Sequence, residues 1–497
     1  MKRYYLGLDQ GTTGTTVLIF DENWENVSRA YKEHKQYYPQ AGWVEHDPIE
    51  IWYAILDTVK MATDQAGITP ADLACIGLDN QGETVMLWDN RTGQPVYNAI
   101  VWQDRRTARM IDEVAATHGD AIRQKTGLVP DAYFSATKIK WIIDNVDGVK
   151  EKISENRINA GTLDTWMIWK LTHGKVFVTD PSTASRTMLF NIHKADWDDD
   201  ILEIFNIPRS ILPEIRNSAE IYEYTDPLDF FGAKIPISGS VVDQQAALFG
   251  QTCFDAGSVK TTYGTGSFML MNTGDKPVYS ENGLLTTVAW GLDGKLSFAL
   301  DAGIYITGAA VQWLRDGVKI IETAAESEKL ATSVDSTNGL YFVPAFVGLA
   351  APHWDQYARG MMIGITGGTT REHIVRATLE SIAYQVKDNF DVMELDSGIK
   401  IDRMAVDGGT TENNFLMQFQ ADILGIPVEV PVINETTALG AAYVAAYGIG
   451  EFKDLDELKK NWKLKKRFEP KMSSDQRESL LHDWYRAVER SKNWEQK

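Results

Sequence analysis

Residues 5–21, YLGLDQGTTGTTVLIFD, place two apolar runs on either side of eight small polar residues at 9–16. The runs at 4–9 and 14–20 are typical of buried β-strands. A tight hairpin needs only two or three small residues between its strands. Glycine lets backbone N–H groups approach a ligand without a Cβ, and threonine hydroxyls add donors. The stretch therefore predicts two strands whose connecting backbone lies close to a ligand.

The rest of the chain alternates strand-like and helix-like segments. Further strands are predicted at 74–79, 259–272, 296–301 and 403–409, and amphipathic helices at 49–65 and 372–390. This alternation predicts an α/β fold. Because 497 residues exceed what one hydrophobic core usually holds, we expect two domains, at 1–250 and 251–497.

Composition limits the partners and the compartment. A formal charge of -20 opposes binding to nucleic acid or to an anionic membrane. The sequence has no run of 18 apolar residues and no signal-like N-terminal segment. Its two cysteines, Cys75 and Cys253, are too few for a zinc cluster and are expected to be reduced core residues. We therefore expect a cytoplasmic protein with neither nucleic-acid nor membrane partners.

Two later segments repeat the pattern of a strand followed by glycine and threonine, at 263–267 and 407–414. The second runs into FLMQFQADIL, a predicted helix whose N-terminus would add partial positive charge. None of the three turns has the spacing of a P-loop or of GxGxxG. Together they predict nucleotide binding through a different phosphate cradle. The similarity of the first two hairpins reflects either a duplicated domain plan or chance.

Two aspartates stand where an acid could act on a nucleotide. Asp9 ends the first strand, where a carboxylate can meet Mg²⁺ carried by phosphates. Asp243 lies among small apolar residues, and phosphoryl transfer to an alcohol needs a carboxylate that accepts the hydroxyl proton. Asp243 could instead cap the helix that begins at QQAALFG, and the two roles are compatible.

Three aromatic residues, Trp102, Tyr133 and Phe268, lie in polar-rich segments rather than in helical stripes. Aromatic faces can line a pocket for the C–H edges of a polyol, although core packing is the commoner role of such side chains. The residues alone leave both roles open.

With these motifs the chain resembles the glycerol kinases, a sugar-kinase family built on the actin-like (ribonuclease H-type) ATPase fold. The stretches that carry the resemblance include GWVEHDP (42–48), YFSATKIKW (133–141), DQQAALFGQ (243–251), TYGTGSFMLMNTG (262–274) and GMMIGITGGTTREHIVRATLE (360–380). The resemblance implies two actin-like domains that close on ATP, Mg²⁺ and a small polyol. It also implies transfer of a phosphoryl group to a primary hydroxyl of glycerol, in a homodimer or homotetramer.

The resemblance further implies a role for each candidate residue. Asp243 would be the catalytic base and, with Asp9, would bind the metal. The substrate would contact Gly82, Glu83, Trp102, Tyr133, Asp243, Gln244 and Phe268. The nucleotide would contact Thr12, Thr13, Gly14, Thr265, Gly308, Gln312, Gly409 and Asn413.

The sequence departs from the usual family pattern at three arginine positions. The motif Asn-Gln-Arg-Glu-Thr has Gly82 in place of its arginine, and Thr16 and Gly367 replace two others. In addition, Asp301 stands where Glu is usual. Gly82 offers the substrate no donor and leaves space beside Glu83. The loss of a charge-assisted hydrogen bond costs about 1.5–3 kcal/mol.

Three interpretations follow from these departures. The chain is a glycerol kinase that tolerates the changes, or a kinase of a four- or five-carbon polyol or ketose. The third is a catalytically weak, actin-like ATP-binding regulator. Retention of Asp9, Asp243 and all three Gly/Thr turns argues against the third interpretation.

Overall fold

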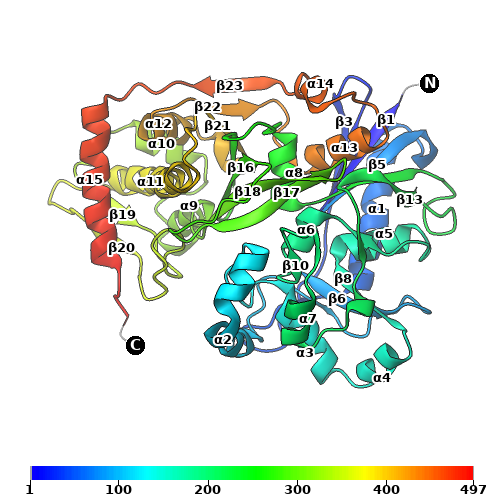
Figure 1. Cartoon of the computed structure of the whole chain (residues 1–497). Helices are drawn as coiled ribbons and strands as arrows, with labels where there is room; N and C mark the ends of the chain where they lie inside the picture. Colours follow the sequence, from blue (N-terminus) through cyan, green and yellow to red (C-terminus); the bar gives the residue numbers. More distant parts are fainter. Residues whose placement is uncertain (1–2, 496–497) are drawn as a thin grey trace.

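The computed structural model describes residues 3–495. Figure 1 shows two halves side by side, each built around one mixed β-sheet. The first sheet has the order β13-β14-β5-β1-β2-β3, and the second has the order β17-β18-β16-β15-β21-β22-β23. The strands of the first sheet are β1 (Tyr4–Gln10), β2 (Gly14–Phe20), β3 (Asn26–Glu33), β5 (Leu73–Asn80), β13 (Ala219–Tyr224) and β14 (Pro236–Val242). Those of the second are β15 (Val259–Tyr263), β16 (Ser267–Gly274), β17 (Leu285–Leu292), β18 (Lys295–Ile304), β21 (Met404–Asp407), β22 (Val428–Pro431) and β23 (Leu464–Phe468).

Both sheets follow one plan. In each, three antiparallel strands are followed by two parallel ones, in the orders β3-β2-β1-β5-β14 and β18-β16-β15-β21-β22. Parallel strands bring their carboxyl ends, and the loops that follow them, to the same edge of a sheet. The two sheets therefore have the duplicated domain plan that was one explanation for the similarity of the first two Gly/Thr hairpins. The predicted α/β class with two actin-like halves is confirmed.

Two helices, α8 (Asp243–Gly250) and α13 (Thr436–Gly448), pack together between the sheets. Small residues allow the close approach: a Cβ at Gly440 would lie 1.8 Å from the carbonyl oxygen of Ala246. Helix α13 also covers β1, where a Cβ at Gly7 would lie 1.9 Å from the carbonyl oxygen of Ala438. A helix from late in the chain therefore completes the first half, and a boundary between residues 250 and 251 stays a prediction.

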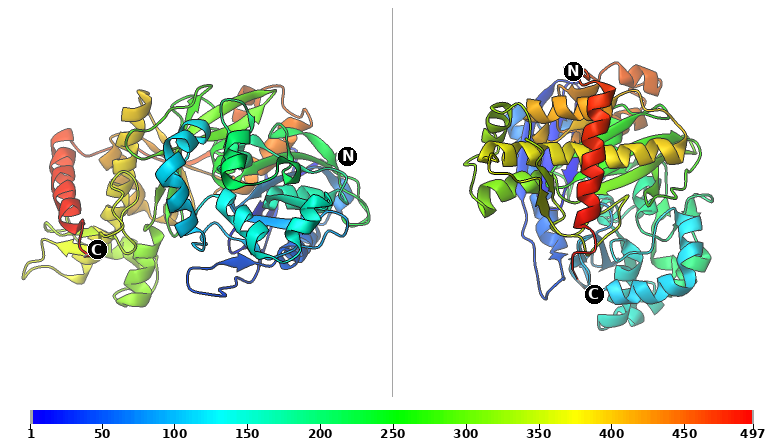
Figure 2. Two further views of the ribbon diagram at one scale, coloured as in Figure 1. Left: turned by 60° about the horizontal axis from the view of Figure 1, so that its bottom comes forward. Right: turned by 90° about the vertical axis from the view of Figure 1, so that its left-hand side faces the viewer.

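The other helices cover the outer faces. In the first half, β4 (Glu45–His46), β6 (Val85–Asp89), β7 (Ala99–Ile100) and β8 (Ile158–Thr162) form a small sheet, and β9 (Val178–Thr179), β10 (Phe190–Asn191), β11 (Asp196–Trp197) and β12 (Glu214–Ile215) form short pairs. Its helices are α1 (Pro48–Ala66), α2 (Ala108–Thr126), α3 (Ser135–Asn145), α4 (Val149–Ser154), α5 (Leu163–Leu171), α6 (Pro181–Ser185) and α7 (Asp199–Phe205). The second half contains β19 (Tyr341–Val343), β20 (Met361–Ile363), α9 (Gly308–Gln312), α10 (Glu326–Thr332), α11 (Arg371–Ser397), α12 (Asn414–Leu424), α14 (Leu455–Lys459) and α15 (Ser474–Ser491). Helix α15 crosses α11 at the outer end (Figure 2), where Trp484 stacks on Tyr384 with ring centroids 5.1 Å apart.

Most local predictions are confirmed, and one is corrected. The strands predicted at 4–9, 14–20 and 74–79 and the helix predicted at 49–65 match β1, β2, β5 and α1 to within one residue at each end. The eight-residue polar stretch is mostly strand, because only residues 11–13 lie outside β1 and β2. Both cysteines are buried and free, as predicted. Within residues 3–495 no helix is long and apolar enough to cross a membrane.

Candidate active site

Three neighbouring strands of the first sheet bring acidic residues to one edge. Strand β1 pairs in parallel with β5, which places Asp9 opposite Asp79. Strand β5 pairs in parallel with β14, which places Asn80 opposite Val242, and Asp243 follows directly. The sequence analysis found Asp9 and Asp243 but missed Asp79, because only the strand order and register bring it beside Asp9.

Asp243 is the first residue of α8, and the residue in the cap position is Val242. The alternative role of Asp243 as the helix cap is therefore wrong. Its carboxylate accepts a hydrogen bond from the backbone N–H of Gln244 at 2.7 Å. Burial, together with the nearby Glu83 carboxylate, raises the pKa of Asp243 to about 7. A carboxylate with this pKa is well matched to accepting a proton near neutral pH.

Lys260, on β15, reaches from the second half toward Asp243. Its buried ammonium group donates hydrogen bonds to Oε1 of Gln244 at 2.5 Å and to Oγ1 of Thr262 at 3.0 Å. Burial lowers the pKa of Lys260, and the carboxylates of Asp407 and Asp243 act in the opposite direction. The sequence analysis missed this residue, although a lysine inside a predicted strand was a visible signal.

Glu83 lies in the loop after β5 and is held by an arginine from a distant part of the chain. Nε of Arg186 donates a hydrogen bond to Oε1 of Glu83 at 2.7 Å, and its Nη1 lies 3.0 Å from Oδ2 of Asp301. All three residues are buried. Arg186 therefore gives the Glu83 carboxylate a buried cationic partner. The sequence analysis quoted its motif, ASRTMLFNI, but gave Arg186 no role.

Gly82 adopts a left-handed backbone conformation, with φ of 65°. A Cβ at this position would lie 3.2 Å from Cγ2 of Val242. Val242 of β14 therefore bounds the space at residue 82 on one side, and the space expected beside Glu83 stays a prediction. An arginine at residue 82 would also be strained, because residues with a Cβ disfavour this conformation.

The three aromatic candidates are partly exposed, which argues against a purely structural core role. The rings of Trp102 and Tyr133 meet edge to face, with centroids 5.6 Å apart. The indole N–H of Trp102 donates a hydrogen bond to Oγ1 of Thr12 at 2.8 Å. Trp102 therefore links Tyr133 to the first Gly/Thr turn. Phe268 lies on β16, opposite Gly303 of β18.

The second and third Gly/Thr turns converge on the start of α9. The backbone N–H of Gly308 donates to the carbonyl oxygen of Gly264 at 3.1 Å, and that of Ala309 donates to Thr265 at 3.0 Å. A Cβ at Gly308 would lie 2.4 Å from the Gly264 oxygen and 3.6 Å from Oγ1 of Thr410. Only glycine fits where these three segments meet.

The other residues predicted to contact the nucleotide belong to these turns or lie near them. They differ in solvent exposure and in whether the fold already uses their side chains. Thr13, Thr265, Gln312 and Gly409 are exposed, whereas Gly14 is buried in β2. Asn413 is occupied in part by the fold, because its side-chain oxygen caps α12 by accepting from the N–H of Leu416 at 3.0 Å. Its side-chain amide donates to Oγ of Ser327 at 3.2 Å.

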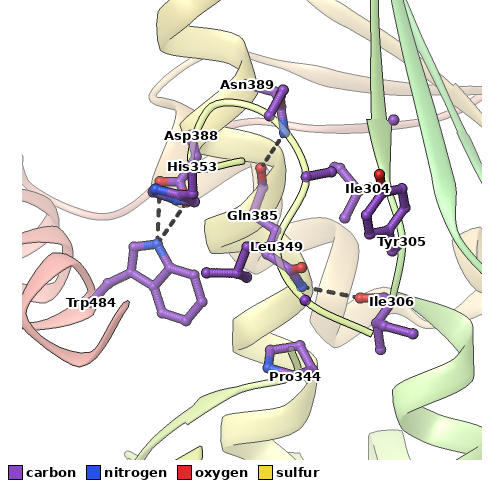
Figure 3. Close-up of a pocket in the computed structure, with 14 residues that line it drawn as sticks. Ile304, Tyr305, Ile306, Pro344, Leu349, His353, Gln385, Asp388, Asn389 and Trp484 are labelled. Carbon is purple, nitrogen blue, oxygen red and sulfur yellow. Dashed lines mark hydrogen bonds and ion pairs between the residues drawn. The ribbon is translucent and has the colours of Figure 1, made fainter. Parts of the chain in front are cut away.

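A separate small cavity lies behind the segment that leads into α9 (Figure 3). The side-chain amide of Gln385 donates to the carbonyl oxygen of Ile306 at 3.1 Å, and the indole N–H of Trp484 donates to Asp388 at 3.0 Å. Its volume of about 20 Å³ is enough for one water molecule. This cavity is too small for a polyol or nucleotide, and its lining supports the start of α9.

No group of three His, Cys, Asp or Glu side chains within residues 3–495 forms a ready-made metal site. Mg²⁺ that arrives with a nucleotide does not need one, since it commonly uses one or two protein carboxylates together with phosphate oxygens. The acidic edge around Asp9 provides such carboxylates. The donor set therefore fits a metal that is shared with a phosphate ligand.

Comparison with known proteins identifies the family. Residues 4–250 match the N-terminal domain of the FGGY family of carbohydrate kinases, and residues 259–449 match its C-terminal domain. The chain belongs to this family. Its FGGY relatives include glycerol kinase 2 of Thermotoga maritima, 60% identical with 100% of both chains covered. The glycerol kinase of Caldanaerobacter subterraneus is 56% identical, with 99% of both covered.

Solved structures of FGGY kinases have the same architecture. The crystal structure of Plasmodium falciparum glycerol kinase with ADP matches with a TM-score of 0.92 at 38% identity, covering 98% of both chains. The ligand-bound xylulose kinase of Lactobacillus acidophilus matches with a TM-score of 0.85 at 22% identity, covering 98% of both chains. The second match shows the fold alone.

Proposed function

We propose that this FGGY kinase transfers the γ-phosphoryl group of ATP to a primary hydroxyl of glycerol, giving glycerol 3-phosphate and ADP. The observation that carries the proposal is the position of Asp243. It lies at the sheet edge that carries the first Gly/Thr turn, and the Glu83 carboxylate is near enough to raise its pKa. The full-length similarity to proteins named glycerol kinase, at 54–60% identity, supports glycerol as the acceptor.

The pocket residues would bind glycerol by its hydroxyl groups and its carbon chain. Glu83, fixed by Arg186, and Gln244, fixed by Lys260, offer polar groups of defined orientation. Trp102, Tyr133 and Phe268 offer aromatic faces and edges for the carbon atoms. Gly82 contributes backbone only, so the donor that an arginine would supply there must come from elsewhere in the pocket.

The nucleotide would lie across the three Gly/Thr turns, whose backbone N–H groups and hydroxyls suit phosphate oxygens. The residues proposed to contact it are Thr12, Thr13, Gly14, Thr265, Gly308, Gln312, Gly409 and Asn413. Mg²⁺, held by Asp9 with Asp243 nearby, would neutralise charge on the phosphates when bound. The side chain of Asn413 would have to serve both its helix cap and the ligand.

In the transfer step, a hydroxyl oxygen of glycerol attacks the γ-phosphorus of ATP in line with the departing ADP oxygen. As the new P–O bond forms, the hydroxyl proton moves to the Asp243 carboxylate. Lys260 holds Gln244 and places a positive charge beside Asp243. Closure of the two halves would exclude water and so limit hydrolysis of ATP.

A kinase of a longer polyol is the second candidate, and Gly82 is the observation that favours it. Arg186 weakens this case, because Glu83 already has a buried arginine partner.

The predicted homodimer or homotetramer and the predicted cytoplasmic location stay predictions.

The proposal is tested by following ADP release from ATP and Mg²⁺ with and without glycerol. We expect release to depend on glycerol and the product to be glycerol 3-phosphate, identified by ³¹P NMR. Equal ADP release without any acceptor would favour an ATP-binding regulator or ATPase instead.

A further inference from the structure

Asp79 carries a buried carboxylate that the proposed mechanism does not use. The residue is fully buried on β5, and neither of its carboxylate oxygens has a hydrogen-bond donor among residues 3–495. Buried polar atoms are nearly always paired, and an unpaired one is costly. As an ionised carboxylate, Asp79 therefore has no hydrogen-bond donor among the described residues.

A second acid lies beside Asp79. Asp9 lies directly opposite Asp79 in the parallel register of β1 and β5, and the two carboxyl groups are within hydrogen-bond reach when one is protonated. Two carboxylates in contact repel each other unless a cation or a proton lies between them.

Both side chains project from the face of the sheet that α13 covers. Gly7 and Gly77, two residues earlier on β1 and β5, lie against the backbone of α13 at Ala438 and Ala441. Strand side chains alternate between faces. Asp9 and Asp79, two residues closer to the carboxyl ends of their strands, therefore project from the same face as Gly7 and Gly77. The first Gly/Thr turn follows directly at this edge, so the acid pair lies next to the proposed phosphate site.

We infer that Asp79 is a second protein ligand of the metal that accompanies ATP, binding it together with Asp9. The inference deepens the proposed function and rests on it for the identity of the nucleotide. Mg²⁺ prefers oxygen ligands and is commonly held by one or two carboxylates plus substrate phosphates. A carboxylate pair at a phosphate-binding edge meets that preference, and the cation removes the repulsion within the pair. The competing role is that of a protonated Asp79 that donates a hydrogen bond to Asp9.

The Asp79→Asn variant separates these roles, because an asparagine amide can donate to Asp9 but adds no carboxylate ligand. Calorimetry measures the affinity for a non-hydrolysable ATP analogue twice, once with a chelator and once with Mn²⁺. No acceptor is present in either measurement. We expect the variant to bind the metal-free analogue at least as tightly as the wild type does, because the variant has one negative charge fewer near the phosphate site. The Mn²⁺ complex should bind at least about tenfold more weakly. The metal coupling is the affinity for the Mn²⁺ complex divided by the affinity for the metal-free analogue. This ratio should be lower in the variant than in the wild type.

A second measurement detects the ligand directly. Water-proton relaxation of the Mn²⁺ complex counts inner-sphere waters, and the variant should gain one water relative to the wild type. Asp164→Asn serves as the matched control, because Asp164 is another buried acid, with threonine hydroxyls as its partners. That variant should keep both the metal coupling and the water count.

The inference is overturned if Asp79→Asn keeps the wild-type metal coupling and the wild-type number of bound waters. Asp79 would then be a protonated donor to Asp9. If Asp79→Asn does not fold, Asp79→Ser, which also removes the carboxylate, is measured in the same two ways. Because no acceptor is present, failure of glycerol to stimulate ADP release would refute the proposed function without affecting this result.

Discussion

The Asp243→Asn variant should lose about 10²- to 10⁴-fold in kcat for phosphoryl transfer, the usual contribution of a general base. Its affinity for ATP should change little, because asparagine preserves the shape of the side chain at the start of α8. Steady-state kinetics and calorimetry measure the two quantities separately. A variant that retains transfer within a few-fold would show that another group accepts the proton.

The pH profile of the wild type reports the same carboxylate. Since burial and Glu83 raise the pKa of Asp243 to about 7, protonation should remove the base as the pH falls below this value. We expect kcat/KM to fall tenfold per pH unit below it. The negative charge of Asp9 also raises the pKa of Asp243, and the positive charge of Lys260 lowers it. Because the positive charge of Lys260 lowers the Asp243 pKa, Lys260→Met should move the acid limb to higher pH.

A buried acid outside the site provides the control for these measurements. Asp388 lies in the second half, where it accepts hydrogen bonds from Trp484 and contacts His353 (Figure 3). Asp388→Asn changes the same atoms as Asp243→Asn, and it should leave kcat and the acid limb unchanged. Loss of activity in both variants would indicate general damage to the fold rather than loss of a base.

The Arg186→Met variant should be strongly destabilised and should bind glycerol poorly. It leaves the buried carboxylates of Glu83 and Asp301 without their cation. Removal of one partner from a buried ion pair costs about 3–5 kcal/mol. Because Glu83 also loses its orienting hydrogen bond, KM for glycerol should rise about 10- to 100-fold. Urea unfolding and acceptor kinetics measure the two effects.

Two further variants show whether the two effects have separate causes. Adding Asp301→Asn to Arg186→Met should recover part of the stability but little of the glycerol affinity. Arg216→Met, which breaks the ion pair with Glu220 outside the pocket, should leave KM unchanged. An Arg186→Met variant with wild-type KM would contradict the assignment of Arg186 as the residue that positions Glu83.

Local sequence patterns predicted the elements that hold the site. The apolar runs around residues 9–16 predicted β1 and β2, because the pattern of a buried strand is local. Asp9 and Asp243 were found because each stands at the junction of an apolar strand and a polar turn or helix start. The three Gly/Thr turns were found from their composition for the same reason, whereas the individual nucleotide contacts were inferred from the family resemblance.

Residues whose role depends on distant partners could not be predicted in this way. Arg186 is 103 positions from Glu83, and nothing near either residue indicates the pairing. Asp79 meets Asp9 only because β1 and β5 are parallel neighbours in a particular register. The hydrogen bond from Trp102 to Thr12 likewise joins residues 90 positions apart. Strand order and register are tertiary properties, so a single sequence does not reveal them.

The substrate preference tests the central claim most directly. ADP release from ATP and Mg²⁺ is measured with glycerol, dihydroxyacetone, erythritol, threitol, ribitol, xylitol and xylulose, and with no acceptor. The account predicts the highest kcat/KM for glycerol, with Glu83 oriented by Arg186. A longer polyol or a ketose preferred by tenfold or more, or turnover that no acceptor stimulates, would contradict it.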